Sequence, residues 1–192
     1  MKKIIILLAL ATSLINCKAQ QTYPLNTYYE DAPNYAYMQD LDNLLPPYAG
    51  TYKATYQGND INLYITYKIK ELIDTKLGGR KYYQDILSIK YIVKKIATGV
   101  ILEDSQNTVS PNEKEIISIG TNIQDGNSIA FLYSGTTCGI GWGRITIKKI
   151  NSTQINWSYY PNGSLFSDGD CPGSQNIKVY LPDTKDLVFT KQ

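Results

Sequence analysis

Apolar and polar positions alternate along much of the central part of the chain. The clearest run covers residues 61–70, where every second residue is apolar and the residues between are mostly polar. Its apolar members are Ile61, Leu63, Ile65, Tyr67 and Ile69. Successive side chains of a strand point to opposite faces, so this run predicts a β-strand with one buried and one solvated face. The same period recurs over residues 51–56 and 87–93.

Further short strands are predicted towards the C-terminus, with turn sequences such as Asp125-Gly126-Asn127 between them. Their expected ranges are 100–104, 115–124, 128–134, 140–149, 153–160 and 176–189. Many one-sided strands on one chain indicate a mainly β fold: an antiparallel up-and-down, lipocalin-like barrel or a strongly curved meander. A two-sheet sandwich stays open, because periodicity does not show closure. One β domain is expected over residues 35–192.

One short N-terminal helix is predicted before the first long strand. Asn34 is placed to cap it, and Pro46-Pro47 is placed to end it. Apolar residues fall at helical spacing between these two points. They are Tyr37, Leu41, Leu44 and Leu45.

The first residues have the pattern of an export signal. Lys2 and Lys3 precede an apolar run over residues 4–15, which is too short to span a bilayer at ~20 residues. Residues 14–17 (Leu-Ile-Asn-Cys) resemble a bacterial lipobox, with Asn in place of the usual small residue. We therefore expect a signal peptide over residues 1–16, a lipid on Cys17 that attaches the protein to a membrane of the cell envelope, and a tether over residues 17–34. The alternative is secretion after cleavage before Gln20.

Composition limits the chemistry. The chain has 17 Tyr, a residue that favours strands and tolerates half-burial, and no His. Without Lys2 and Lys3 its 19 basic residues become 17, equal to the 17 acidic ones. Nucleic acid is therefore not an expected partner. The missing histidine removes Ser-His-Asp catalysis and the commonest metal ligand, so we expect no enzyme, no cofactor and no metal site.

Two cysteines remain once Cys17 is set aside, Cys138 and Cys171. Outside the cytosol an even pair usually forms a disulfide, which is the expectation here. Two buried thiols or a redox pair are the alternatives, although the spacing is not that of a C-x-x-C motif.

Several short motifs together resemble an uncharacterised family of small lipoproteins of Gram-negative bacteria, which has a domain of unknown function. They are the segments 16–20 (NCKAQ), 23–27 (YPLNT), 45–56 (LPPYAGTYKATY) and 61–65. The resemblance covers most of the chain and implies no known activity. Gly50-Thr51-Tyr52 is also similar to the G-x-W motif of lipocalins, with Tyr52 in place of Trp. That likeness implies a barrel.

The most unusual stretch is residues 135–144 (GTTCGIGWGR). If extended, its alternate glycines would leave a stripe without side chains that admits either a packed neighbour or a ligand. Trp142, Arg144 and Trp157 are the expected ligand contacts. The carboxylates of Asp168 and Asp170 could hold calcium, but the rest of an EF-hand loop is missing, and a turn is the simpler interpretation.

Two functions are favoured, and an enzyme that uses Asp, Glu, Tyr or Lys chemistry is the least expected third. The first is a binding module that holds a small apolar or amphipathic ligand, or a glycan, in the mouth of the barrel. The second is a structural lipoprotein without a ligand cavity, which contacts another envelope protein through its surface.

Overall fold

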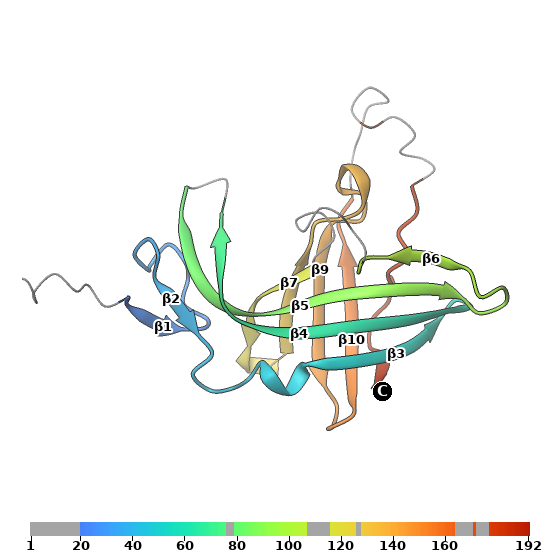
Figure 1. The fold of residues 1–192 in the computed structure, drawn as a ribbon, viewed down its shortest axis with the longest axis horizontal. Helices are drawn as coiled ribbons and strands as arrows, with labels where there is room; N and C mark the ends of the chain where they lie inside the picture. Colours follow the sequence, from blue (N-terminus) through green and yellow to red (C-terminus); the bar gives the residue numbers. More distant parts are fainter. Residues whose placement is uncertain (1–19, 76–78, 107–115, 126–127, 164–170, 172–176) are drawn as a thin grey trace, which may run out of the picture.

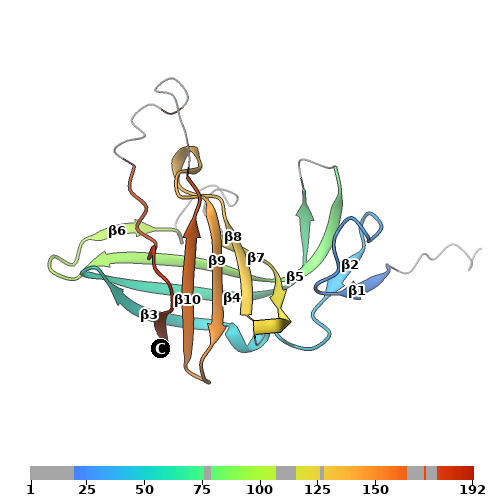
Figure 2. The ribbon, with the colours of Figure 1, turned by 180° about the vertical axis from the view of Figure 1, so that it is seen from behind.

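The computed structural model describes residues 20–75, 79–106, 116–125, 128–163, 171 and 177–192. Eight antiparallel strands form a closed barrel (Figures 1 and 2). They are β3 (Gly50–Tyr56), β4 (Asn59–Asp74), β5 (Lys81–Lys95), β7 (Ile116–Asn122), β8 (Ser128–Tyr133), β9 (Gly143–Lys149), β10 (Gln154–Pro161) and β11 (Leu187–Lys191). Strands that follow one another around the barrel pair side by side, and two contacts close the ring, β11 with β3 and β5 with β7. The predicted antiparallel up-and-down barrel is confirmed.

The strand periodicity decides which side chains fill the barrel. The inward residues of β4 and β5 are the alternating apolar positions predicted from the sequence, as far as Ile65 and Val93. Inward residues from the other strands complete a dry core with Trp157 and Phe189 in tilted contact, 5.8 Å between ring centroids. The described part of the interior is therefore occupied by side chains. Among those that are fully buried are Tyr52, Tyr91, Tyr133, Phe131, Ile61, Leu63, Leu87 and Ile89.

A second, smaller unit lies at one end of the barrel. There the β4–β5 hairpin continues beyond the barrel and bends at a bulge between Lys68 and Glu71 (Figure 1). β2 (Tyr37–Gln39) pairs parallel with the outer part of β5, and β1 (Thr22–Pro24) pairs parallel with β2. We call residues 20–45 the N-terminal lobe. The lobe has its own small core of buried Ala32, Ala36 and Met38.

A buried carboxylate holds the lobe on the hairpin. Asp85 is 1% exposed, and its oxygens accept hydrogen bonds from the Tyr37 hydroxyl at 2.6 Å, the Lys70 amide at 3.0 Å and the Asp40 amide at 2.9 Å. The Asp40 carboxylate in turn accepts from the amides of residues 44 and 45. A buried carboxylate needs such donors, because burial without them is costly. Asp85 thus joins β2, the β4 bulge and β5.

The predicted N-terminal helix is wrong. Residues 37–39 form β2, and the following residues turn around Asp40 into a short 3-10 helix at Pro46–Tyr48. Tyr35 and Asn43 have φ angles of 64° and 52°, which a right-handed helix does not accommodate. Backbone pairing of Tyr37 with β5 takes the place of helical hydrogen bonds. Of the four apolar residues at helical spacing, Leu45 is buried in the main core, whereas Leu41 is 56% exposed.

The disulfide between Cys138 and Cys171 is confirmed. The neighbouring glycines do not form the extended stripe considered from the sequence. Thr137–Gly139 is a 3-10 turn, and Gly139 and Gly141 have φ angles of 72° and 75°. A Cβ on Gly141 would clash with Val179 and the Tyr159 hydroxyl, so close packing explains this glycine.

The remaining elements are β6 (Ile101–Asp104), which pairs with β5, and a 3-10 turn at Ile123–Asp125. No helix in the described residues has the length and apolar character needed to cross a membrane. The expected signal peptide, Cys17 and the Asp168–Asp170 segment lie outside the described residues. The strand expected over 176–189 is shorter and later, at Leu187–Lys191.

Candidate functional site

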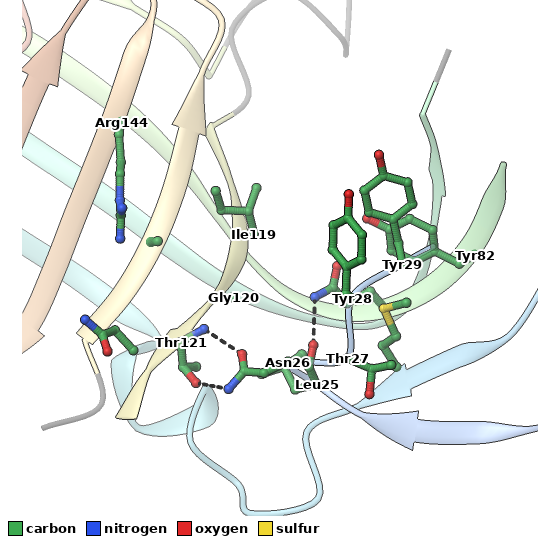
Figure 3. A pocket seen from close by; sticks show the side chains of 14 residues that line it. Leu25, Asn26, Thr27, Tyr28, Tyr29, Tyr82, Ile119, Gly120, Thr121 and Arg144 are labelled. Carbon is green, nitrogen blue, oxygen red and sulfur yellow. Dashed lines mark hydrogen bonds between the residues drawn. The ribbon is translucent and has the colours of Figure 1, made fainter. Parts of the chain in front are cut away.

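A surface pocket lies between the N-terminal lobe and the outer face of the barrel (Figure 3). Its volume is about 350 Å³, within the ~300–1,000 Å³ range of small-ligand sites. One wall comes from the lobe and β5, and the other from β7, β8 and β9. The lining residues are Leu25, Asn26, Thr27, Tyr28, Tyr29, Met38, Tyr82, Gln84, Ile119, Gly120, Thr121, Asn122, Ala130 and Arg144.

Three tyrosines form the lobe-side wall. The rings of Tyr29 and Tyr82 are stacked, with centroids 5.9 Å apart, and Tyr28 lies tilted against Tyr29 at 5.0 Å. Tyr28 is 55% exposed, whereas Tyr29 and Tyr82 are half-buried against the small core of the lobe. Burial raises the pKa of Tyr82, and burial together with Glu30 raises that of Tyr28. Both phenols are therefore neutral hydrogen-bonding groups at neutral pH.

The barrel-side wall is shaped by a β-bulge in β7. The register between β7 and β8 shifts between Ser118 and Gly120, and the extra residue, Ile119, is 54% exposed at the pocket. Bulges redirect side chains in this way. Gly120 has a φ angle of 151°, and a Cβ there would lie 3.3 Å from the Asn26 Oδ1. Glycine thus allows the lobe to approach the barrel closely.

Asn26 connects the two walls. Its Nδ2 donates to the Thr121 hydroxyl at 2.6 Å, and its Oδ1 accepts from the Thr121 amide at 2.9 Å (Figure 3). Gln84, which is 4% exposed, donates to the Leu25 carbonyl at 3.5 Å. Leu25 belongs to the main core, so the lobe is fixed at the base of the pocket by both packing and hydrogen bonds.

Arg144 supplies the only charge among the described residues that line this pocket. It is exposed on β9, on the side opposite the tyrosines in Figure 3. Within the described residues, its guanidinium makes no hydrogen bond or salt bridge. Two acids outside the lining are hydrogen-bonded to it: Glu30 accepts from the Tyr29 hydroxyl, and Asp125 accepts from the Asn122 side chain and also from Ser128. Hydrogen bonds from Ser128 lower the pKa of Asp125.

The structure separates the three ligand contacts expected from the sequence. Arg144 lines the pocket, but Trp142 and Trp157 do not. Trp142 is 43% exposed just before β9. Trp157 is fully buried in the barrel, where its indole donates to the Pro182 carbonyl at 3.1 Å. Trp157 therefore belongs to the core.

Sequence reasoning missed the tyrosine wall and Asn26. The signal was present as a tyrosine-rich segment without a strand or helix period, which we interpreted as a tether. The structure instead pairs residues 22–24 with β2 and brings Leu25 and Asn26 into contact with the barrel. Asn26 and its partner Thr121 are 95 residues apart in the chain, and no local pattern links them.

Fold and pocket together define a small antiparallel β-barrel protein with an added N-terminal lobe that forms one wall of a surface pocket. The chain belongs to DUF6705, a family of unknown function, whose family model matches residues 1–192. No curated protein and no solved structure matches the chain.

Proposed function

We propose that this protein is a non-catalytic binding protein of the bacterial cell envelope, which takes a small ligand in the pocket between the N-terminal lobe and the barrel. The observation that carries the proposal is the pocket itself: partly exposed aromatic rings line one side and the Arg144 guanidinium, which has no partner among the described residues, lines the other, with amides and hydroxyls between them. Such a combination of apolar surface and a few convergent polar groups is typical of ligand sites. The filled barrel interior favours this outer pocket over the barrel mouth as the place where a ligand binds.

The buried carboxylates of Asp85 and Asp40 have a structural task, which agrees with a non-catalytic role. Asp85 and Asp40 accept hydrogen bonds that hold the lobe in place, and neither lines the pocket. Among the described residues, the pocket lining contains no carboxylate, thiol or lysine that could act as a nucleophile or general base.

We further propose that the protein is a lipoprotein of a Gram-negative bacterium, exported by its leader and attached to a membrane through Cys17. Four residues separate Cys17 from the start of β1 at Thr22. At ~3.5 Å per extended residue, β1 lies within about 18 Å of the lipidated cysteine. The pocket would then face the space directly above the membrane surface.

The ligand proposal is tested on full-length protein purified from the membrane fraction in mild detergent and examined by native mass spectrometry. We expect the protein to carry a co-purified small molecule. Tyr28→Ala should lose that molecule, because it removes the most exposed ring of the pocket. Tyr35→Ala is the matched control, since Tyr35 is also in the lobe and 51% exposed but does not line the pocket. Bare wild-type protein, or equal loss from both variants, would contradict the proposal.

The anchoring proposal has a separate test, the mass of the N-terminal peptide of the mature protein. We expect an acylated peptide beginning at Cys17 and a membrane-bound protein. Cys17→Ala should move the protein out of the membrane fraction. A mature N-terminus at Gln20 without lipid would instead support secretion.

A further inference from the structure

The shape and the polar groups of the pocket identify a chemical class of ligand, an inference that rests on the proposed binding function. We infer that the pocket binds an acidic sugar, whose ring packs on the tyrosine wall and whose carboxylate pairs with Arg144. Three features of the pocket support this class of ligand: its aromatic wall, the distribution of its polar groups, and its charge.

The aromatic wall favours a ligand with an apolar face. Tyr28 and Tyr29 present ring surface beside the stacked Tyr82, and tyrosine combines an apolar face with a hydroxyl that remains in water. The C–H face of a pyranose packs well on such rings. A purely apolar ligand would also fit this wall, so the choice depends on the other groups.

Polar groups surround the remaining space. Asn26, Thr27 and Thr121 lie between the two walls, and Asn122 lies at the end of β7. Asn26 uses one N–H and one lone pair of its amide for Thr121, which leaves a second N–H and a second lone pair for a ligand. A pyranose carries donors and acceptors around its whole ring, so it can satisfy groups on several sides. An apolar ligand would leave them unpaired, at a cost of ~1–3 kcal/mol each.

The charge of the pocket lining favours a ligand that places one carboxylate beside Arg144. The lining has one cation, Arg144, and no anion, and within the described residues the guanidinium has no competing partner. A guanidinium binds a carboxylate through two parallel N–H···O bonds. Phosphate sites usually add further cations or a helix N-terminus with free amides. The described lining contains neither a lysine nor a helix N-terminus, so it matches a carboxylate better than a phosphate.

The test compares digalacturonate with its dimethyl ester, which has lost both negative charges and carries a methyl group on each carboxyl, by isothermal titration calorimetry with the full-length protein in detergent. We expect the acid to bind at least about tenfold more tightly than the ester, equivalent to ~1.4 kcal/mol for the charged pair. The affinity for the acid should fall as salt is added. Arg144→Gln should remove this preference and leave the affinity for the ester within about twofold. Lys148→Gln is the matched control, with the same charge change on an exposed residue of β9 that does not line the pocket.

The outcomes separate this inference from the proposed function. Equal affinities for acid and ester, unchanged in Arg144→Gln, would overturn the carboxylate assignment while the pocket still binds sugar. No binding of either probe, together with a different co-purified molecule lost in Tyr28→Ala, would overturn the sugar assignment and leave the binding function standing. No binding of either probe and bare protein in native mass spectrometry would overturn both.

Discussion

Tyrosine performs opposite tasks in the barrel and in the N-terminal lobe. In the barrel, Tyr91 and Tyr133 are fully buried, and the Tyr91 hydroxyl donates to Glu103 at 2.9 Å and lies 3.5 Å from the Tyr133 hydroxyl. In the lobe, Tyr28 and Tyr29 pack on one another but leave ring surface open at the pocket. Tyr91 and Tyr133 thus find partners inside the barrel, whereas Tyr28 and Tyr29 of the lobe leave ring surface available to a partner.

The two regions also differ in what holds them together. The barrel has a large apolar core and a continuous ring of strand pairs. The lobe has a small core of Ala32, Ala36 and Met38 and depends on hydrogen bonds to Asp85, Asp40 and Asn26. Because apolar burial scales with area, we expect the lobe to open at a lower free energy than the barrel. The difference places the proposed binding site at the less stable end of the molecule.

The largest effect should come from removing a core aromatic. Trp157→Ala deletes a fully buried indole and its hydrogen bond to Pro182, so we expect the free energy of unfolding to fall by ~3–5 kcal/mol. Trp142→Ala should cost less than ~1 kcal/mol, because Trp142 is 43% exposed. Guanidinium unfolding followed by far-ultraviolet circular dichroism measures both. Similar losses in the two variants would contradict the assignment of Trp157 to the core and of Trp142 to the surface.

The next effect should be confined to the lobe. Asp85→Asn keeps the shape of the side chain but replaces one acceptor oxygen by a donor, which leaves a buried N–H or O–H without its acceptor. We expect a cost of ~1–3 kcal/mol. Hydrogen exchange should show faster exchange at the amides of Tyr37 and Met38, while the Leu63 amide in the barrel keeps its protection. Asp42→Asn, on an exposed residue of the lobe, is the control. Equal loosening of barrel and lobe would show that the two are one cooperative unit.

The barrel could be predicted from the sequence because its strands obey a local rule. Inward and outward residues alternate from Ile61 to Ile65 and from Leu87 to Val93, and burial follows that alternation except at Ser88, which is 2% exposed. Ile69 breaks it: its parity predicts an inward side chain, yet it is 66% exposed. The bulge between Lys68 and Glu71, where the hairpin leaves the barrel, changes the register. A bulge of this kind has no clear signature in a single sequence.

The pocket could not be predicted because it depends on contacts between distant segments. The lobe carries a pattern that resembles a helix, but pairing of Tyr37 with Tyr83 makes it a strand. Of the three residues predicted to contact a ligand, Arg144 lines the pocket, whereas Trp142 and Trp157 do not. Trp157 lies two residues after the buried Ile155 in β10, so the alternation of side chains along a strand predicts that Trp157 also points inward. The same alternation places Trp142, next to the buried Gly143, on the outer face, so this rule distinguishes the two tryptophans.

Alkaline pH should distinguish the buried tyrosines of the barrel from a solvated phenol. Burial, with a contribution from Glu103, raises the pKa of Tyr133 to about 12, above its ordinary value of 10.0. The folded protein keeps this proton while the unfolded chain loses it, so stability is lost as pH rises from about 10 through about 12. At pH 11 the loss from this one group is about 1.4 kcal/mol.

Tyr133→Phe removes this contribution because phenylalanine does not ionise. Urea unfolding at pH 8 and pH 11 should therefore show a smaller decrease in stability for the variant than for the wild type, by up to about 1.4 kcal/mol. Comparing each protein with itself at the two pH values removes the constant cost of the lost hydroxyl. Identical decreases in wild type and variant would mean that Tyr133 is not shielded from water.

The smallest effect should come from the contact that closes the pocket. Asn26→Ala removes both hydrogen bonds to Thr121, at a site where Asn26 is exposed, so we expect a cost of about 1 kcal/mol. Thr121→Val is a graded comparison: it removes only the hydroxyl that accepts from Nδ2 and retains the backbone amide that donates to Oδ1, so its cost should be about half as large. Hydrogen exchange at the amide of residue 121 should accelerate more in Asn26→Ala than in Thr121→Val. If neither variant changes this exchange, the lobe is held by Leu25, Gln84 and the Asp85 hydrogen bonds without Asn26, and Asn26 is free to serve a ligand with its whole amide.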